Sequence, residues 1–220
     1  MKDDHTTEKQ PRERKTETDH NTNKTNSGEN LAGLIKEASQ VVNERNPRAL
    51  RLIAKGLAVA NQTNALQQKV ELFFLQAKAF NTIKNDRKKF LALLAQAEAL
   101  SKAIQDGARL AKIRYHKAVD AHLNGNFKLV RKLASEILNL DLPKNDVSRI
   151  NALSMSGAAD VTEGKLESAL AKFKKTLKIY LSNNDPSRAA VAYLNIGTTI
   201  RNMGDYEKAL EYGLKALELS

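Results

Sequence analysis

The side chains with which this chain could perform acid–base or metal chemistry are few and scattered. Of its four histidines, His5 and His20 lie in a polar N-terminal segment, while His116 and His122 are six residues apart. On a helix that spacing places the two rings on different sides, so we do not expect them to share a metal ion. The sequence contains no cysteine, which excludes disulfides, thiol nucleophiles and thiolate metal sites.

Catalysis and cofactor binding have no other visible basis in the sequence. Single carboxylates occur along the chain, and none forms a pair in an apolar setting that would raise a pKa for acid catalysis. Phosphate loops, dinucleotide-binding glycine patterns and nucleophile elbows are not found. We therefore expect a protein that is not an enzyme and that uses no metal and no cofactor.

The bulk composition is that of a soluble protein, with 41% hydrophobic and 28% charged residues. No apolar run approaches the roughly 18 residues that a membrane-spanning helix needs. The N-terminus lacks the apolar stretch of a secretory signal, and the absence of cysteine fits a reducing compartment. We expect a cytoplasmic protein that does not bind membranes.

The net charge of +11 is concentrated in the middle of the chain. Residues 31–150 hold 21 Lys and Arg against 10 Asp and Glu, whereas 1–30 hold six against seven and 151–220 hold nine against eight. A basic surface attracts nucleic acid, anionic lipid or acidic protein, but lysines spread over many segments also fit a solvated face. The cations that a nucleic-acid-binding surface would use are Lys84, Arg87, Lys88, Lys89, Lys112, Arg114, Lys117, Lys128, Arg131 and Lys132.

The chain divides into a polar segment and a long amphipathic region. Residues 1–29 contain almost no apolar side chains, so we expect a disordered tail there. Over 30–220, apolar residues recur at helical spacing, as in Leu31, Leu34 and Ala38. No stretch alternates in the manner of a strand, and the sequence therefore predicts an all-α domain.

Short breaks divide this region into about ten helices that form five hairpins. They combine glycine for left-handed helix ends, Asn or Asp for caps and proline for first turns, and such short connections make neighbouring helices antiparallel. Asn85, Gly125, Gly164 and Gly204 are 40, 39 and 40 residues apart, a period typical of stacked hairpins that complete one another's cores. The breaks are 45–47, 84–86, 124–126, 141–143, 163–165, 183–186 and 203–205.

The segment 187–220 carries the clearest repeat. It combines a large aromatic, a bulky residue followed by glycine, a turn between two helices, and two small residues in the second helix. Those residues are Tyr193, Ile196, Gly197, Gly204, Asp205, Tyr206, Ala209 and Ala216. In this order the segment closely resembles the tetratricopeptide repeat (TPR), and Gly157, Gly164 and Ala169 extend the resemblance into the preceding unit. The resemblance implies a right-handed superhelical solenoid of about five antiparallel hairpins.

The resemblance also implies a function. The period of about 40 is longer than the usual 34 and is similar to repeats in sensory regions of bacterial signalling and regulatory proteins. It implies a protein- or peptide-binding scaffold or sensory module of such a protein. A nucleic-acid-binding helical repeat protein that uses the basic middle region (31–150) is the alternative.

A stack of such hairpins forms a groove that is lined by the first helix of each unit. Asn195 is the residue we favour in it, because an amide can both donate to and accept from an extended peptide backbone; the competing interpretation is that Asn195 only bonds an adjacent helix. In the register of the family, the groove side chains expected to contact a partner are Lys112, Tyr115, His116, Asn151, Ser154, Asn195, Thr198, Arg201 and Asn202.

The last helix of the sequence has an apolar side without an expected neighbour. Leu210, Leu214 and Leu217 recur on one face, and the sequence stops at Ser220 as that helix finishes. Repeat arrays normally end in a helix with a polar outer face. We therefore expect a homodimer, another partner or a C-terminal continuation to cover this hairpin.

Overall fold

A computed structural model describes the backbone of residues 19–219 and the side chains of residues 30–219. Helices joined by short turns make up this part of the chain, which contains no strand. The predicted all-α class and the five hairpins are confirmed. The ten helices are α1 (Asp19–Asn43), α2 (Arg48–Gln62), α3 (Leu66–Thr82), α4 (Arg87–Ala103), α5 (Gly107–Leu123), α6 (Phe127–Leu138), α7 (Val147–Thr162), α8 (Leu166–Ser182), α9 (Pro186–Asn202) and α10 (Tyr206–Glu218).

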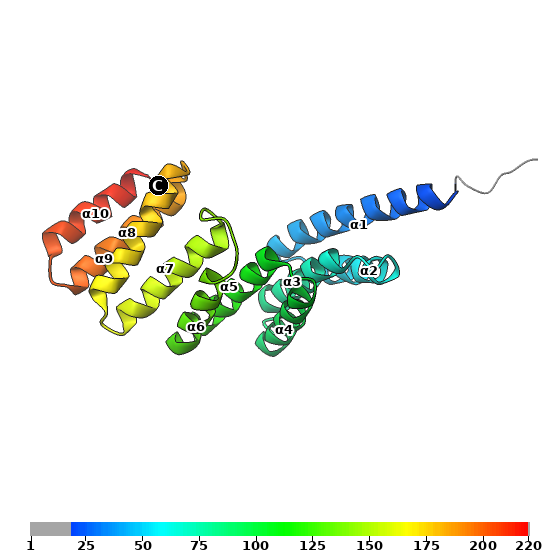
Figure 1. The fold of residues 1–220 in the computed structure, drawn as a ribbon, viewed down its shortest axis with the longest axis horizontal. Coiled ribbons are helices and arrows are strands. Elements are labelled where there is room, and N and C mark those ends of the chain that lie inside the picture. The colour runs from blue at the N-terminus through cyan, green and yellow to red at the C-terminus, as the bar shows by residue number, and fades with distance from the viewer. Residues whose placement is uncertain (1–18, 220) are drawn as a thin grey trace, which may run out of the picture.

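The first helix begins earlier than the boundary that we expected at residue 30. It starts at Asp19 and so includes residues 19–29 of the polar segment in which we expected a disordered tail. The rest of that segment, 1–18, lies outside the described residues. Figure 1 shows the start of α1 reaching past α2 at one end of the molecule.

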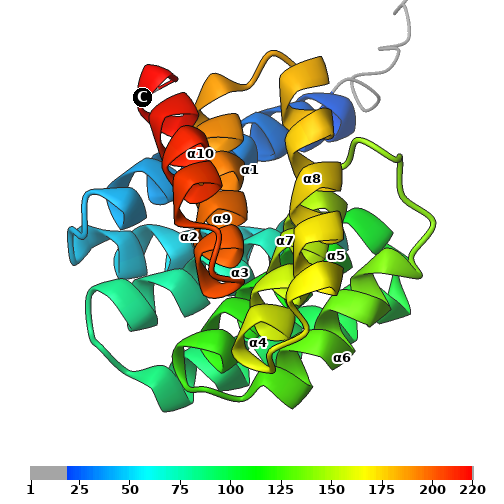
Figure 2. The same ribbon diagram turned by 90° about the vertical axis from the view of Figure 1, so that its left-hand side faces the viewer.

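The helices form an elongated stack of two layers. In Figure 1 the array runs from α1 at one end to α10 at the other, and Figure 2 looks onto the end formed by α8, α9 and α10. Each odd-numbered helix packs against the next odd-numbered one, from α1 to α9. Even-numbered helices of the described part pack only against their neighbours in sequence. The odd-numbered helices are therefore the inner layer of an α-helical solenoid.

The turns within the hairpins repeat one backbone device. The residues at 45, 85, 125, 164 and 204 all have a positive φ, between 52° and 93°. Glycine adopts this conformation without steric cost and asparagine tolerates it. In the first hairpin the position is occupied by Arg45, a residue with a long side chain. The period of about 40 residues therefore continues back to the first hairpin without a glycine to mark it.

Two junctions between hairpins were absent from the breaks read in the sequence. They lie at Asn64, between α2 and α3, and at Gln105, between α4 and α5, and both residues have a positive φ. Neither junction contains proline, and neither has glycine at its left-handed position. Asn64 tolerates the left-handed conformation as Asn85 does, and Asp106 caps α5, so the sequence does mark these two junctions, though without glycine or proline.

Most helices begin with a side-chain cap of the expected kind. An aspartate or asparagine accepts a hydrogen bond from a backbone N–H two or three residues ahead, which satisfies one of the free donors of the first turn. This contact fixes the start of each helix relative to the preceding turn. The capping residues are Asp86, Asp106, Asn126, Asp146, Asp185 and Asp205.

Small residues allow close packing between the two helices of a hairpin. A methyl group at Gly197 would lie 3.1 Å from the carbonyl oxygen of Ala209, which belongs to the backbone of α10. At Gly157 a methyl group would lie 2.9 Å from the ring of Phe173, whose side chain is almost fully buried. Both glycines were singled out from the repeat pattern, and each faces the second helix of its own hairpin.

Candidate functional site

A pocket of about 310 Å³ opens on the inner layer between α5, α7 and α9, and we call it the inner-layer pocket. Four of the nine predicted groove residues line it: Tyr115 from α5, Asn151 and Ser154 from α7, and Asn195 from α9. The repeat places equivalent faces of successive first helices side by side. Residues far apart in the sequence therefore meet in one pocket.

The polar groups of this pocket are arranged to donate and to accept hydrogen bonds. The Tyr180 hydroxyl donates to Oδ1 of Asn151 at 3.1 Å, which leaves the amide N–H groups of Asn151 available. Burial raises the pKa of Tyr180, so the phenol stays a donor at neutral pH. Within the part of the chain that the structure describes, the side-chain amide of Asn195 has no hydrogen-bond partner. The competing interpretation, that this amide bonds an adjacent helix, finds no such bond there.

The rest of the pocket lining is largely apolar or neutralised. Met155, Val191 and Ala192 contribute apolar surface. Arg188 is the one cation among the lining residues, and its guanidinium donates to Asp185 at 2.7 Å. The pocket therefore combines neutral hydrogen-bonding groups with apolar walls, which is the composition typical of small binding pockets.

Five lining residues are not among the nine predicted contact residues: Met155, Tyr180, Arg188, Val191 and Ala192. Arg188 and Val191 lie seven and four residues before Asn195 on α9, so extending the face of Asn195 by helical periodicity would have found them. Tyr180 comes from the second-layer helix α8 and reaches the pocket from its last turn. No register of first helices could have identified it.

Two predicted groove residues of α5 lie outside this pocket. Lys112 binds Glu71 of α3 through a 2.9 Å contact between its Nζ and Oε1, and its Nζ also lies 4.4 Å from the ring centre of Phe74. His116 packs edge-on against Phe74 with ring centres 4.8 Å apart. Burial, together with the charges of Lys78 and Lys112, lowers the pKa of His116 to about 4. Both side chains hold α5 against α3.

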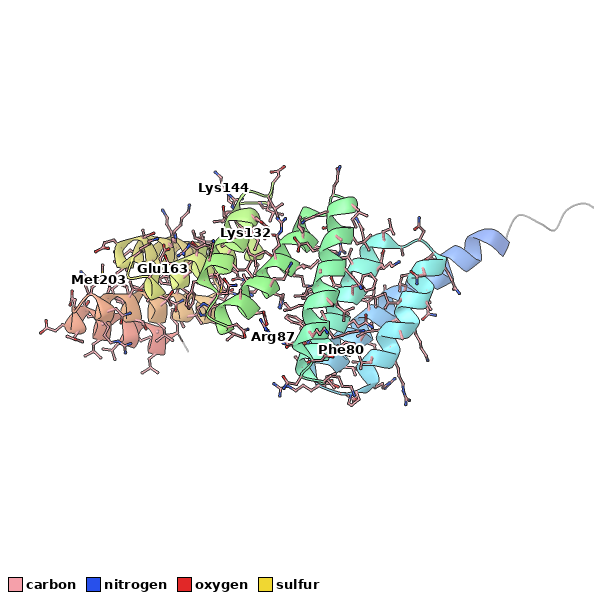
Figure 3. All side chains as sticks on the ribbon, turned by 90° about the horizontal axis from the view of Figure 1, so that it is seen from below. Phe80, Arg87, Lys132, Lys144, Glu163 and Met203 are labelled. Atoms are coloured by element: carbon pink, nitrogen blue, oxygen red, sulfur yellow. The ribbon has the colours of Figure 1, made fainter. Side chains whose placement is uncertain are left out.

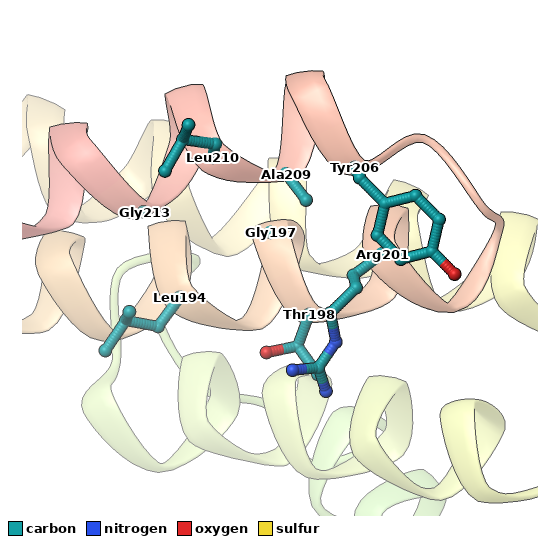
Figure 4. Close-up of a pocket in the computed structure, with 8 residues that line it drawn as sticks. All are labelled: Leu194, Gly197, Thr198, Arg201, Tyr206, Ala209, Leu210 and Gly213. Atoms are coloured by element: carbon teal, nitrogen blue, oxygen red, sulfur yellow. The ribbon is translucent and has the colours of Figure 1, made fainter.

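The remaining predicted residues lie farther along α9. Thr198 and Arg201 line a second pocket, of about 300 Å³, on the surface where α9 and α10 face solvent. Figure 4 shows both beside Leu194 and Tyr206 on that surface, with Gly197 behind them. Asn202 is exposed at the last turn of α9. The nine predicted residues are thus divided among three places.

The outer side of the last hairpin exposes a row of apolar side chains, which we call the terminal surface. The exposed fractions reach 71% for Tyr206, 65% for Leu210 and 72% for Leu217. Leu214 is 52% exposed, and these four positions are spaced by four, four and three residues on α10. That spacing keeps the four side chains on one face of the helix.

Half of the cations named for the basic middle region are engaged in ion pairs. Arg87 binds Asp120 through two contacts of 2.8 Å, and Arg131 binds Glu163. With Lys112, Arg114 and Lys117, five of the ten cations that a nucleic-acid-binding surface would use contact carboxylates. In Figure 3, Arg87 is labelled together with Lys132 and Lys144, and of these labelled cations Arg87 is the one with an ion pair among the described residues.

The most enclosed of these contacts centres on Glu98 of α4. Its carboxylate contacts Lys102 at 3.0 Å, Arg114 at 3.2 Å and Lys117 at 2.7 Å. Burial alone would raise the pKa of Glu98, but the hydrogen bonds from Lys117, Lys102 and Arg114 outweigh it and lower the pKa to about 2. Because Arg114 also contacts Glu136 at 3.2 Å, the network joins α4, α5 and α6.

Over residues 30–219, no three His, Asp or Glu side chains gather in a way that could hold a metal ion. The described helices also include none with the length and apolarity to span a membrane.

Comparison with known proteins supports the fold. No family model and no curated protein matches the sequence. The crystal structure of BtubC (BKLC) from P. vanneervenii is similar, with a TM-score of 0.58 at 14% sequence identity. The match covers 86% of this chain and 90% of that chain. At this identity the similarity concerns the fold alone.

Proposed function

We propose that this chain is a tetratricopeptide-type interaction module that binds a polypeptide segment in the inner-layer pocket. The observation that carries the proposal is the convergence of Tyr115, Asn151, Ser154 and Asn195 from three successive first helices on one pocket. Extended peptides commonly lie along the inner surface of helical repeat arrays. A scaffold or sensory part of a bacterial regulatory or signalling protein is the role that suits such a module.

The chemistry of the pocket indicates what kind of segment it would accept. The free amide of Asn195 can donate to one backbone group and accept from another, and the Asn151 N–H groups can donate to a carbonyl. Since Arg188 is already paired with Asp185, the pocket offers no unpaired charge among its lining residues. We therefore propose a neutral, partly apolar segment as the ligand.

Two features of the last hairpin support its assignment to the tetratricopeptide type. The clearest repeat, 187–220, coincides with α9 and α10. Gly197 stands at a position where the repeat has a small residue, and its lack of a side chain lets α9 approach α10 closely. The ordinary close packing of two helices requires a small residue at such a point.

Binding of nucleic acid receives less support from the charges. Half of the cations named for it are neutralised by carboxylates, and the inner-layer pocket offers no free cation. A row of unpaired cations along one face is what a phosphate backbone needs. We therefore do not extend the proposal to nucleic acid.

The terminal surface is the place at which we propose contact with a second copy of this chain. The apolar residues of α10 are flanked by charges of both signs, with Glu207 and Lys208 near its start and Lys215 and Glu218 near its end. Two antiparallel copies of α10 would place apolar residues together and opposite charges near one another. Sedimentation equilibrium of the chain and of a Leu210→Gln, Leu214→Gln variant tests this. We expect the wild-type chain to form a dimer and the variant to be a monomer. A wild-type chain that stays monomeric when its concentration is raised about 100-fold contradicts the proposal.

The proposed peptide site is tested by selecting ligands from a random peptide library displayed on phage, with the whole chain as bait. We expect selected peptides to lose at least about tenfold in affinity on Asn195→Ala, because about 1.4 kcal/mol corresponds to a factor of ten. Asn202→Ala is the matched control, since Asn202 is an exposed asparagine on the same helix and does not line the inner-layer pocket. Equal binding to both variants would place the site elsewhere.

A further inference from the structure

A third pocket lies on the outside of the array and differs from the other two in charge. It measures about 580 Å³ and lies between the connection of α6 to α7, the first turn of α7 and the last turns of α8. Four cations line it: Lys144, Arg149, Lys175 and Lys178. We call it the outer basic pocket. The proposed peptide site and the terminal surface do not include any of these four residues.

This pocket lies at the least regular connection of the repeat. Residues 139–146 form the longest connection between two described helices, and Pro143 lies within it. Asp146 then caps α7 by accepting from the backbone N–H groups of Ser148 and Arg149. Lys175 and Lys178 are three residues apart on α8, so they lie on the same face of that helix.

The guanidinium of Arg149 is held in place by the backbone. It donates to the carbonyl oxygen of Leu140 at 3.3 Å, across the connection that it follows. This contact orients the planar group and leaves its remaining N–H donors without a carboxylate. An oriented guanidinium is suited to bidentate contact with a phosphate group.

The four cations of the outer basic pocket form no ion pair within the described part of the chain. Among the described residues, none of those lining it is acidic, and Lys144, Lys175 and Lys178 form no ion pair. Of the carboxylates on the adjoining segments, Asp146 accepts from backbone N–H groups at the start of α7, and Asp185 binds Arg188. Four unneutralised cations around one concave surface raise the local concentration of anions.

We propose that the outer basic pocket binds a compact ligand that carries two or more phosphate groups. One phosphate group bears about two negative charges at neutral pH, so two or three such groups match four cations, whereas single carboxylates would require four separate groups. Asn145, Ser182 and Asn183 add neutral groups that can hydrogen-bond phosphate or hydroxyl oxygens.

The shape of the pocket favours a compact ligand over a polymer. Its volume lies in the range of pockets that bind small molecules, and its four cations line that one pocket. A nucleic acid would need cations spaced along its backbone, and many of the cations in the preceding helices are engaged in ion pairs. Soluble polyphosphates and phosphorylated lipid headgroups share the chemistry that the pocket requires.

Isothermal titration of the full chain with tripolyphosphate, at about physiological salt, tests this proposal. We expect one saturable site whose affinity falls at least tenfold in the Lys175→Gln, Lys178→Gln variant. The matched control is Lys84→Gln, Lys88→Gln, which removes the same charge from two exposed lysines that also lack an ion pair in the described region. We expect its affinity to stay within twofold of the wild type.

Binding to lipid vesicles distinguishes the source of the phosphate groups. Vesicles that contain about 5% phosphatidylinositol bisphosphate should capture the chain in competition with tripolyphosphate if the ligand is a lipid headgroup. If the vesicles do not capture it while tripolyphosphate binds, the ligand is a soluble phosphate compound. The absence of saturable tripolyphosphate binding would overturn the proposal. An equal loss of affinity in the two lysine variants, or tighter binding of random duplex DNA that both variants weaken alike, would also overturn it.

Discussion

The cations of α3–α6 and those of the outer basic pocket carry the same charge but have different neighbours. In the first region Arg87, Lys112 and Arg114 contact carboxylates of other helices and join successive hairpins. In the second region Lys144 and Lys175 face a pocket without an acidic neighbour among the described residues. The excess of positive charge in the sequence lies at 31–150, yet much of it is neutralised there. A count of charges therefore does not locate the charge that is available to a ligand.

Glu98→Gln is expected to give the largest effect and to show what the paired cations contribute. The substitution removes the carboxylate shared by Lys102, Arg114 and Lys117 and leaves an enclosed guanidinium with less compensation. Breaking such a contact costs about 3 kcal/mol of unfolding free energy. Urea denaturation followed by circular dichroism measures it. A loss below about 0.5 kcal/mol would mean that the network does not join α4 to α5 energetically.

The second prediction concerns the stability of the protein in acid, which depends on His116 of α5. His116 has a folded pKa of about 4 against an ordinary 6.5, because it is buried near Lys78 and Lys112. The folded state therefore binds fewer protons than the unfolded chain between these values. The stability contribution is complete above pH 6.5 and is lost as the pH falls toward 4, by at most about 1.4 kcal/mol per pH unit.

The variant His116→Gln separates this effect from the general loss of stability in acid. Glutamine cannot gain the proton, so the dependence of the unfolding free energy on pH between 6.5 and 4 should become shallower than in the wild type. His122→Gln is the control, since that ring also packs against an aromatic side chain, Phe127. Identical pH profiles for the wild type and His116→Gln would contradict the assignment.

The third prediction concerns a paired cation at the surface. Arg87 forms two contacts with Asp120, but its side chain is 54% exposed. An exposed ion pair contributes little, and Arg87→Gln should therefore lower the unfolding free energy much less than Glu98→Gln does, and less still in about 0.5 M salt. Denaturation at the two salt concentrations measures the difference. A loss as large as that of Glu98→Gln would show that the burial of an ion pair does not determine how much it contributes to stability.

The smallest effect is expected in the outer basic pocket. Lys175→Gln, Lys178→Gln removes two exposed cations that lie near two others, so the unfolding free energy should stay within about 0.5 kcal/mol of the wild type or rise slightly. Thermal denaturation without added phosphate measures it. A clear destabilisation would mean that these lysines serve the fold, and the contrast with the paired region would disappear.

The fold was largely predictable from the sequence because turn and cap residues mark most of the helix ends. Glycine or asparagine at the left-handed positions 85, 125, 164 and 204 and aspartate or asparagine caps marked the helix ends. The junction at Asn64 was missed although it has the same residue type at its left-handed position as Asn85, and the junction at Gln105 has a glutamine there, which is not a turn signal. The start of α1 at Asp19 also escaped, since polar residues without apolar periodicity give no helical signal.

The candidate site was predictable only in part, because packing between hairpins decides which side chains stay free. Helical register placed Asn151 and Asn195 correctly on one surface. It could not show that Lys112 binds Glu71, which is 41 residues away, or that His116 packs on Phe74. The outer basic pocket was missed for the same reason, since its lysines come together only through the packing of α8 beside α7.

The measurement that tests the central proposal most directly is methyl NMR of the full chain with a peptide selected on it. Methyl groups of Met155, Val191 and Ala192 line the inner-layer pocket, whereas those of Leu210 and Leu214 lie on the terminal surface. The proposal predicts that saturating peptide shifts the first set and leaves the second unchanged. Shifts confined to Leu210 and Leu214, with Met155 and Val191 unaffected, would contradict binding in the inner-layer pocket.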